Sequence, residues 1–185
     1  MADTQKINTT KSLTMIALMT AVICVLSPFF FPIVFSPVPI TLGTLAIYLT
    51  VCILGTRKGT VSCLLYILLG LVGLPVFSGF SGGAGKLFGP TGGYIIGYLF
   101  LTLIAGIFVD KYPGKWYLCL FGMICGTATC YFFGTLWLAH QMQLSFISAL
   151  SIGVLPYIPA DFLKMMIALF LGTTVRQALI RANLL

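Results

Sequence analysis

Long apolar stretches, separated by short basic or glycine-rich links, are the feature of this sequence that most restricts its fold. They cover residues 13–26, 40–54, 60–74, 92–109, 117–138 and 154–175. Only 7% of the residues are charged, against roughly 25% in soluble domains, so the chain cannot surround a core of this size with a polar shell. Apolar segments of this kind cross a bilayer as helices. The sequence therefore predicts an all-α membrane protein, a compact bundle of six transmembrane helices in a single domain spanning residues 1–185.

Basic residues occur in pairs on alternate links, and this pattern predicts the orientation of the bundle. The pairs are Lys6 with Lys11, Arg57 with Lys58, Lys111 with Lys115, and Arg176 with Arg181. Because basic links face the cytoplasm, both termini, including the polar segment 1–12, are expected to be cytoplasmic. The links 28–39, 75–91 and 139–153 then face outward. We expect a bacterial cytoplasmic membrane, with anionic lipid rather than nucleic acid as the partner of the basic residues.

One acid and one base interrupt the predicted sixth span. Asp161 and Lys164 are the only oppositely charged residues within any span, and a charge at the bilayer centre costs about 2.5–3.5 kcal/mol on insertion scales. Three residues apart, they share one helix face, so each can lower the desolvation cost of the other. Pro159 is typical of a helix start, which would put Asp161 in a first turn. The pair indicates a polar site for a small ligand, with a structural ion pair or a proton relay as alternatives.

The glycine-rich link 79–94 and the aromatic residues near the outer face supply further candidate ligand contacts. Glycines such as Gly82 let the backbone approach a ligand closely, and Lys86 is a candidate partner for a carboxylate. The aromatic candidates for the wall of an apolar pocket are Phe77, Tyr94 and Tyr157. The alternatives are a flexible hairpin, a solvated lysine and a belt of aromatic side chains at the membrane interface.

Two further observations concern partners and chemistry. Ala17 and Ala21 leave a flat strip on the first helix, which suits either packing within the chain or docking of another helix. The sequence has no cluster of potential metal ligands, no paired acids for catalysis and no nucleotide-binding motif. We therefore expect no catalytic residue, metal or cofactor in this chain, and any ATP and Mg²⁺ would be used by partner subunits.

Three segments together resemble the BioY family, the biotin-binding S components of energy-coupling factor transporters. They are Gly89-Pro90-Thr91-Gly92-Gly93-Tyr94, Pro159-Ala160-Asp161-Phe162-Leu163-Lys164 and Ser36-Pro37-Val38-Pro39-Ile40-Thr41. The resemblance extends over nearly the whole chain. It implies a six-helix subunit that captures biotin from outside and works with a transmembrane coupling protein and two ATPase subunits.

The resemblance also implies roles for particular residues. Ala17 and Ala21 match the surface that docks the coupling protein, and the link 28–39 matches a lid. Asp161 and Lys164 match positions that contact biotin, where Asp161 would accept from a ureido N–H and Lys164 would donate to the ureido oxygen or to the carboxylate. Lys86 or backbone N–H groups would otherwise meet the carboxylate. The alternative function is a proton-coupled secondary carrier or a membrane-embedded enzyme that uses Asp161.

Overall fold

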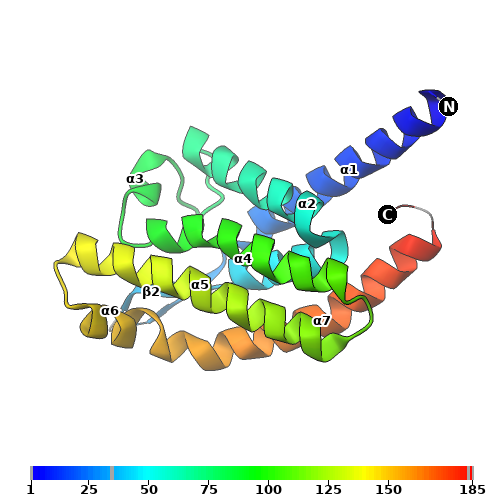
Figure 1. Cartoon of the computed structure of the whole chain (residues 1–185). Helices are drawn as coiled ribbons and strands as arrows, with labels where there is room; N and C mark the ends of the chain where they lie inside the picture. Colours follow the sequence, from blue (N-terminus) through cyan, green and yellow to red (C-terminus); the bar gives the residue numbers. More distant parts are fainter. Residues whose placement is uncertain (1, 34–35, 183, 185) are drawn as a thin grey trace.

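The computed structural model describes residues 2–33, 36–182 and 184, with the backbone alone for residues 2–9. Its helices are α1 (Ala2–Leu26), α2 (Gly43–Val72), α3 (Ala84–Leu87), α4 (Gly92–Lys111), α5 (Trp116–Met142), α6 (Phe146–Gly153) and α7 (Ile158–Arg181), with a 3-10 turn at Leu155–Tyr157. Two short strands, β1 (Phe30–Ile33) and β2 (Ser36–Thr41), lie between α1 and α2. The long helices lie side by side as a bundle (Figure 1). The all-α membrane fold is confirmed.

The six predicted spans correspond to α1, the two halves of α2, α4, α5 and α7. Within the described part of the chain, four helical segments are long and apolar enough to cross a membrane: α2, α4, α5 and the α6–α7 segment. Residues 10–26 of α1 form a shorter apolar helix. The predicted second and third spans are the two halves of α2. The predicted polar segment 1–12 is not separate from the first helix, because α1 already begins at Ala2.

Gly55 divides α2 into two antiparallel halves. Its φ of 75° and ψ of −163° are not helical, and a backbone of this kind is nearly restricted to glycine. The chain reverses direction at Gly55, because Gly59 after the turn packs against Thr50 before it. A Cβ atom on Gly59 would lie 3.6 Å from the carbonyl oxygen of Thr50. The second half ends at Gly73, whose φ of 113° is the left-handed conformation of a glycine helix cap. Although α2 is assigned as one helix, it therefore provides two segments that run in opposite directions on either side of Gly55.

The carboxylate of Asp110, at the end of α4, ties together three elements at one end of the bundle. Its Oδ2 accepts from the backbone N–H of Thr56 at 2.8 Å and from the Thr56 hydroxyl at 2.7 Å. Its Oδ1 accepts from Nη2 of Arg176 on α7 at 3.0 Å. The predicted basic links around residues 57, 111 and 176 thus lie at the same end, and both chain termini lie on that side in Figure 1.

The end of the bundle away from Asp110 contains regular secondary structure where loops were predicted. The predicted loop 28–39 forms most of an antiparallel hairpin in which Phe30 pairs with Thr41 and Phe31 with Ile40. Residue 40, the predicted start of the second span, is therefore in β2, and α2 begins only at Gly43. The predicted loop 139–153 contains α6, whose first turn is capped by Ser145. These elements form a cover over one end of the bundle.

Candidate functional site

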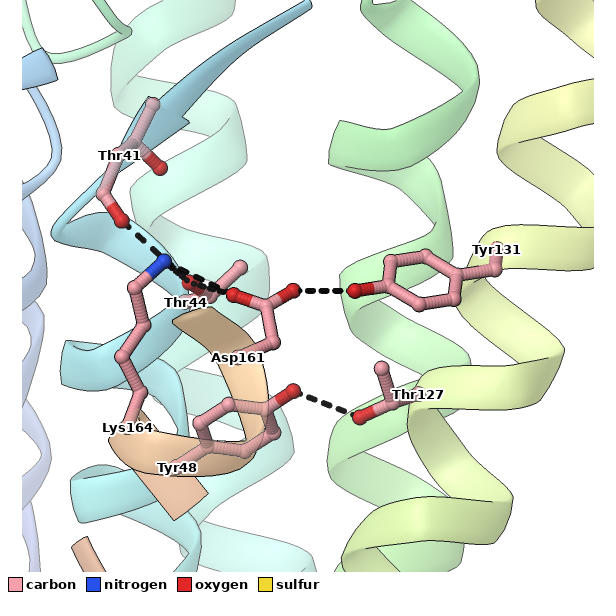
Figure 2. A network of polar contacts seen from close by, with 7 residues as sticks. All are labelled: Thr41, Thr44, Tyr48, Thr127, Tyr131, Asp161 and Lys164. Carbon is pink, nitrogen blue, oxygen red and sulfur yellow. Dashed lines mark hydrogen bonds and ion pairs between the residues drawn. The ribbon is translucent and has the colours of Figure 1, made fainter. Parts of the chain in front are cut away.

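Asp161 and Lys164 lie in the first turns of α7 and form the centre of a buried polar network (Figure 2). Lys164 Nζ lies 2.8 Å from Asp161 Oδ1, and the two residues are only 8% and 5% exposed. Because α7 begins at Ile158, followed by Pro159, the carboxylate sits near the positive end of the helix dipole. This placement and the opposite charge lower the cost of burying either group.

Two hydroxyl groups from other helices complete the network. The Tyr131 hydroxyl on α5 donates to Asp161 Oδ2 at 2.6 Å. The Thr44 hydroxyl, at the start of α2, accepts from Lys164 Nζ at 2.9 Å and donates to Asp161 Oδ1 at 3.2 Å. Below them, the hydroxyls of Tyr48 and Thr127 lie 2.6 Å apart. In Figure 2 the Asp161 carboxylate points between Lys164 and Tyr131. Three helices thus hold one ion pair.

The network forms part of the wall of a cavity of about 440 Å³ at the covered end of the bundle. Aromatic and aliphatic side chains form most of the remaining wall, with Tyr94, Tyr98 and Leu101 from α4 and Val38 from β2. Cavities with apolar walls and a few converging polar groups are typical of small-ligand sites. The arrangement can hold a mostly apolar molecule by one polar end.

A second cavity of about 370 Å³ adjoins the first. The two share five lining residues: Val38, Pro39, Thr41, Tyr94 and Tyr98. A shallower pocket lined by Pro39, Ser78 and Lys86 follows at the surface. A chain of three spaces therefore runs from the ion pair toward the glycine-rich link.

The β hairpin is fastened over the cavity by Tyr157. Its hydroxyl hydrogen-bonds the carbonyl oxygen of Val38 and lies 2.7 Å from Ser36 Oγ. Tyr94 makes a similar connection from α4, donating to the carbonyl oxygen of Gly153 at 3.1 Å. The cover is therefore held by side chains that also line the cavity.

Replacing Tyr157 with Phe should loosen the hairpin without disturbing the bundle. A neutral hydrogen bond contributes about 1 kcal/mol, which corresponds to roughly a fivefold change in an opening equilibrium. Amide hydrogen exchange in residues 36–41 should therefore accelerate about fivefold, as measured by mass spectrometry. Tyr117→Phe, at an exposed tyrosine on α5, is the control and should leave exchange in this segment unchanged. Equal exchange in Tyr157→Phe and the unaltered protein would contradict the fastening role.

The sequence-predicted ligand contacts divide into two groups. Asp161, Lys164, Tyr94 and Tyr157 all line the first cavity. Phe77 lies in the core instead, fully buried, with its ring 5.5 Å from that of Tyr66. Gly82 packs against backbone, since a Cβ atom there would lie 2.3 Å from the carbonyl oxygen of Leu74. Neither residue lines the cavities described above, so a contact between either one and a ligand stays a prediction.

Lys86 lies apart from the ion pair. It is in α3 and lines only the outer pocket, and partial burial lowers the pKa of its ammonium group from the usual value.

The glycines that precede Tyr94 act in packing. A Cβ on Gly92 would overlap the carbonyl oxygen of Leu87, and one on Gly93 would lie 2.3 Å from Trp137 Cβ. These glycines let α4 begin close to its neighbours and so place Tyr94.

Ala17 and Ala21 are both exposed on α1, whereas Met19 and Ile23 on the same helix are buried. The two alanines thus lie on the outer surface of the bundle rather than in a contact within the chain. Thr44, Tyr48, Thr127 and Tyr131 were not among the predicted site residues. Hydroxyl side chains are common in membrane helices, where they often bond their own backbone, and nothing in their spacing relates them to Asp161.

A bundle of apolar helices with a buried ion pair at the wall of an apolar cavity defines a membrane protein that binds a small molecule. The sequence model of the BioY family matches residues 2–181. A protein named biotin transporter BioY2 from Lactococcus lactis subsp. cremoris (strain MG1363) is 39% identical over 174 residues, covering 93% of each chain. The biotin transporter BioY of Thermotoga maritima is 33% identical over 146 residues, or 77% of this chain and 83% of that one.

Among solved structures, the chain resembles the crystal structure of the S-component for biotin from an ECF-type ABC transporter. The TM-score is 0.86 at 34% sequence identity, over 96% of this chain and 95% of that chain. The chain belongs to the BioY family.

Proposed function

We propose that this chain is the biotin-binding membrane subunit, or S component, of an energy-coupling factor transporter. It captures biotin in the cavity beside Asp161 and is a substrate-binding subunit rather than an enzyme. The observation that carries the proposal is the buried ion pair of Asp161 and Lys164, which Thr44 and Tyr131 hold at the wall of an apolar cavity. Biotin is proposed as the ligand because the similar protein of Lactococcus lactis is named a biotin transporter and the similar solved structure is an S-component for biotin.

The remaining hydrogen-bonding capacity of the pair matches the ureido group of biotin. An ammonium group has three donors, and Lys164 uses two of them, on Asp161 and Thr44. A carboxylate oxygen accepts about two hydrogen bonds, and Asp161 Oδ2 receives one, from Tyr131. One donor and one acceptor remain, on two residues that both line the first cavity. A ureido carbonyl and an adjacent ureido N–H satisfy both, through charge-assisted bonds.

The cavity walls suit the rest of the ligand. Tyr94, Tyr98 and Leu101 offer apolar surface to the fused rings and the hydrocarbon chain. The continuation into the second cavity gives the chain of the ligand a path away from Asp161. The β hairpin covers the ligand, and its opening admits biotin. These features support binding of a long, mostly apolar molecule with polar groups at both ends.

The orientation in the membrane follows from the charges. The end that carries Arg57, Lys58, Lys111 and Arg176 faces the cytoplasm, and with it both termini. The cavity then faces outward under the hairpin, as capture from outside requires. We place the subunit in a bacterial cytoplasmic membrane.

The partners are a transmembrane coupling protein and two ATPase subunits, which use ATP and Mg²⁺ in place of any cofactor in this chain. The exposed Ala17 and Ala21 let a helix of the coupling protein approach α1 closely. This face lies on the outside of the bundle, so docking there does not require the cavity to change.

Replacing Ala17 with Trp should therefore block assembly and spare ligand binding. The indole occupies the space that an approaching helix needs, whereas Ala17 lines neither cavity. Copurification with the coupling protein should fall at least tenfold, with the dissociation constant for biotin unchanged. Leu103→Trp, at an exposed position on α4, is the control. Normal assembly of Ala17→Trp would contradict the docking role.

The proposed function is tested by the mass of the small molecule that copurifies with the protein from cells grown on biotin. Native mass spectrometry should find one biotin per chain, and uptake in cells should require the ATPase subunits. Uptake that follows a proton gradient and persists without those subunits would favour the carrier alternative, in which Asp161 titrates. A different bound molecule would overturn the assignment of the substrate.

A further inference from the structure

An open groove of about 600 Å³ lies at the end of the bundle away from the ligand cavity. This is the end where α4 turns into α5 and where α7 finishes (Figure 1). Val109, Cys119 and Ile180 provide apolar wall, and Arg176 and Gln177 provide polar wall. None of these residues lines the cavities near Asp161 or the outer pocket. The groove is therefore a separate site.

Arg176 offers unused hydrogen-bond donors to this groove. One of its amino groups donates to Asp110 Oδ1 at 3.0 Å, and the other lies 3.5 Å from the carbonyl oxygen of Cys52. A guanidinium group has five N–H donors, so three have no partner among the described residues. The side chain is 25% exposed. The two contacts thus hold the guanidinium at the wall of the groove, where a ligand can reach its other donors.

The groove extends from the membrane surface into the apolar part of the bundle. Val109, in the last turn of α4, and Cys119, in the first turn of α5, are both buried. Trp116 and Tyr117, at the start of α5, are 60% and 53% exposed. Exposed aromatic side chains of this kind are typical of the level of the lipid headgroups. The polar wall at Arg176 therefore meets headgroups, and the apolar wall meets hydrocarbon.

The surface around the groove is basic. Lys111 and Lys115 are in the link between α4 and α5, and Arg181 is in the last turn of α7. The residues that line the groove include no acidic side chain, and the nearby carboxylate of Asp110 is paired with Arg176. Basic clusters at the cytoplasmic surface of a membrane attract anionic lipids. The charge of this region is thus complementary to an anionic headgroup.

We propose that this groove binds an anionic phospholipid of the cytoplasmic leaflet. The phosphate accepts hydrogen bonds from the guanidinium of Arg176, whose planar shape suits two parallel bonds to one phosphate. An acyl chain lies along Val109 and Cys119, where a free phosphate ion would leave apolar wall uncovered. The choice of leaflet rests on the orientation proposed above. Lipid binding here is independent of the ligand in the first cavity.

Gln177→Glu tests the lipid site without removing the ion pair of Arg176 and Asp110. Gln177 is exposed and lines the groove, so the change places a negative charge beside the phosphate with little risk to the fold. Native mass spectrometry of the purified chain, titrated with phosphatidylglycerol, should show one retained lipid. Its dissociation constant should rise about tenfold in Gln177→Glu, because like charges repel at short range.

Two other probes distinguish a lipid site from general attraction of anions. Phosphatidylcholine, whose headgroup has no net charge, should bind the unaltered protein about tenfold more weakly than phosphatidylglycerol. Glycerol phosphate has the anionic group without acyl chains, and it should not displace the bound lipid. Equal binding of the two lipids, or displacement by glycerol phosphate, would overturn the proposal.

Ala178→Glu is the matched control. Ala178 is the next residue on α7 and is also exposed, but it does not line the groove. The same added charge should change the dissociation constant for phosphatidylglycerol by less than about twofold, because solvent and salt screen it. Equal losses in the two variants would contradict a defined site.

Binding of biotin separates this proposal from the proposed function. Both variants should bind biotin as the unaltered protein does, and failure of the unaltered protein to bind biotin would contradict the proposed function alone. If Gln177→Glu prevented assembly with the coupling protein and left lipid binding unchanged, a protein segment rather than a lipid would occupy the groove, and the proposal would be wrong.

Discussion

Replacing Asp161 with Asn is expected to weaken biotin binding by about 10- to 100-fold. The change removes a charged acceptor for the ureido N–H, and a hydrogen bond to a charged group contributes about 1.5–3 kcal/mol. It also leaves the ammonium of Lys164, which is 8% exposed, without its counter-charge at 2.8 Å. Titration calorimetry on the purified variant measures the loss.

Asp110→Asn is the matched control for this prediction. Asp110 also accepts hydrogen bonds from two residues, Thr56 and Arg176, but it lies at the end of the bundle away from the cavity. The control should lower the melting temperature and leave the dissociation constant for biotin within about twofold of the unaltered protein. If both variants lost affinity equally, the effect of Asp161→Asn would reflect general destabilisation, and the site would be wrong.

Replacing Gly55 with Ala is expected to destabilise the fold by about 3–5 kcal/mol. A non-glycine residue in this backbone conformation costs on the order of 1–3 kcal/mol. The added methyl group would also lie 2.1 Å from Oδ1 of Asp110, so the carboxylate must leave Thr56 or Arg176, at a further cost of about 1.5–3 kcal/mol. Thermal unfolding in detergent should show a clearly lowered midpoint.

Gly114→Ala separates the cost of the backbone conformation from the cost of displacing the Asp110 carboxylate. Gly114 also has a positive φ, of 83°, but a Cβ atom there would meet nothing within 4 Å. Its replacement should therefore cost only the backbone preference, roughly 1 kcal/mol. Equal destabilisation by the two substitutions would mean that Asp110 does not constrain the turn in α2, and that the account of this hairpin is incorrect.

The sequence was sufficient to predict the helices and to single out the pair Asp161 and Lys164, for a physical reason. Charge is so costly inside an apolar span that Asp161 and Lys164 stand out without any structural information. The same argument explains why the basic links lie at one end of the bundle. In contrast, Tyr131 and Thr44 carry neutral hydroxyls, and only the packing of α5 and α2 against α7 brings them to the carboxylate.

The loops could not be predicted because their structure depends on pairing between distant residues. The hairpin of β1 and β2 is rich in proline, which disfavours strands in local analysis, yet Tyr157 from another part of the chain fastens it. Phe77, an aromatic residue in the outer link 75–91, was a candidate for the wall of a ligand pocket. Its ring instead occupies the space left by Gly70, where a Cβ atom would lie 2.1 Å away.

The most direct test of the central claim is titration calorimetry of biotin into the purified, ligand-free chain without any partner subunit. The account predicts one binding site per chain and affinity in the nanomolar range, about −12 kcal/mol, as expected for an apolar cavity with charge-assisted contacts. Folded protein that shows no binding of biotin, in the presence of a normal melting transition, would contradict it.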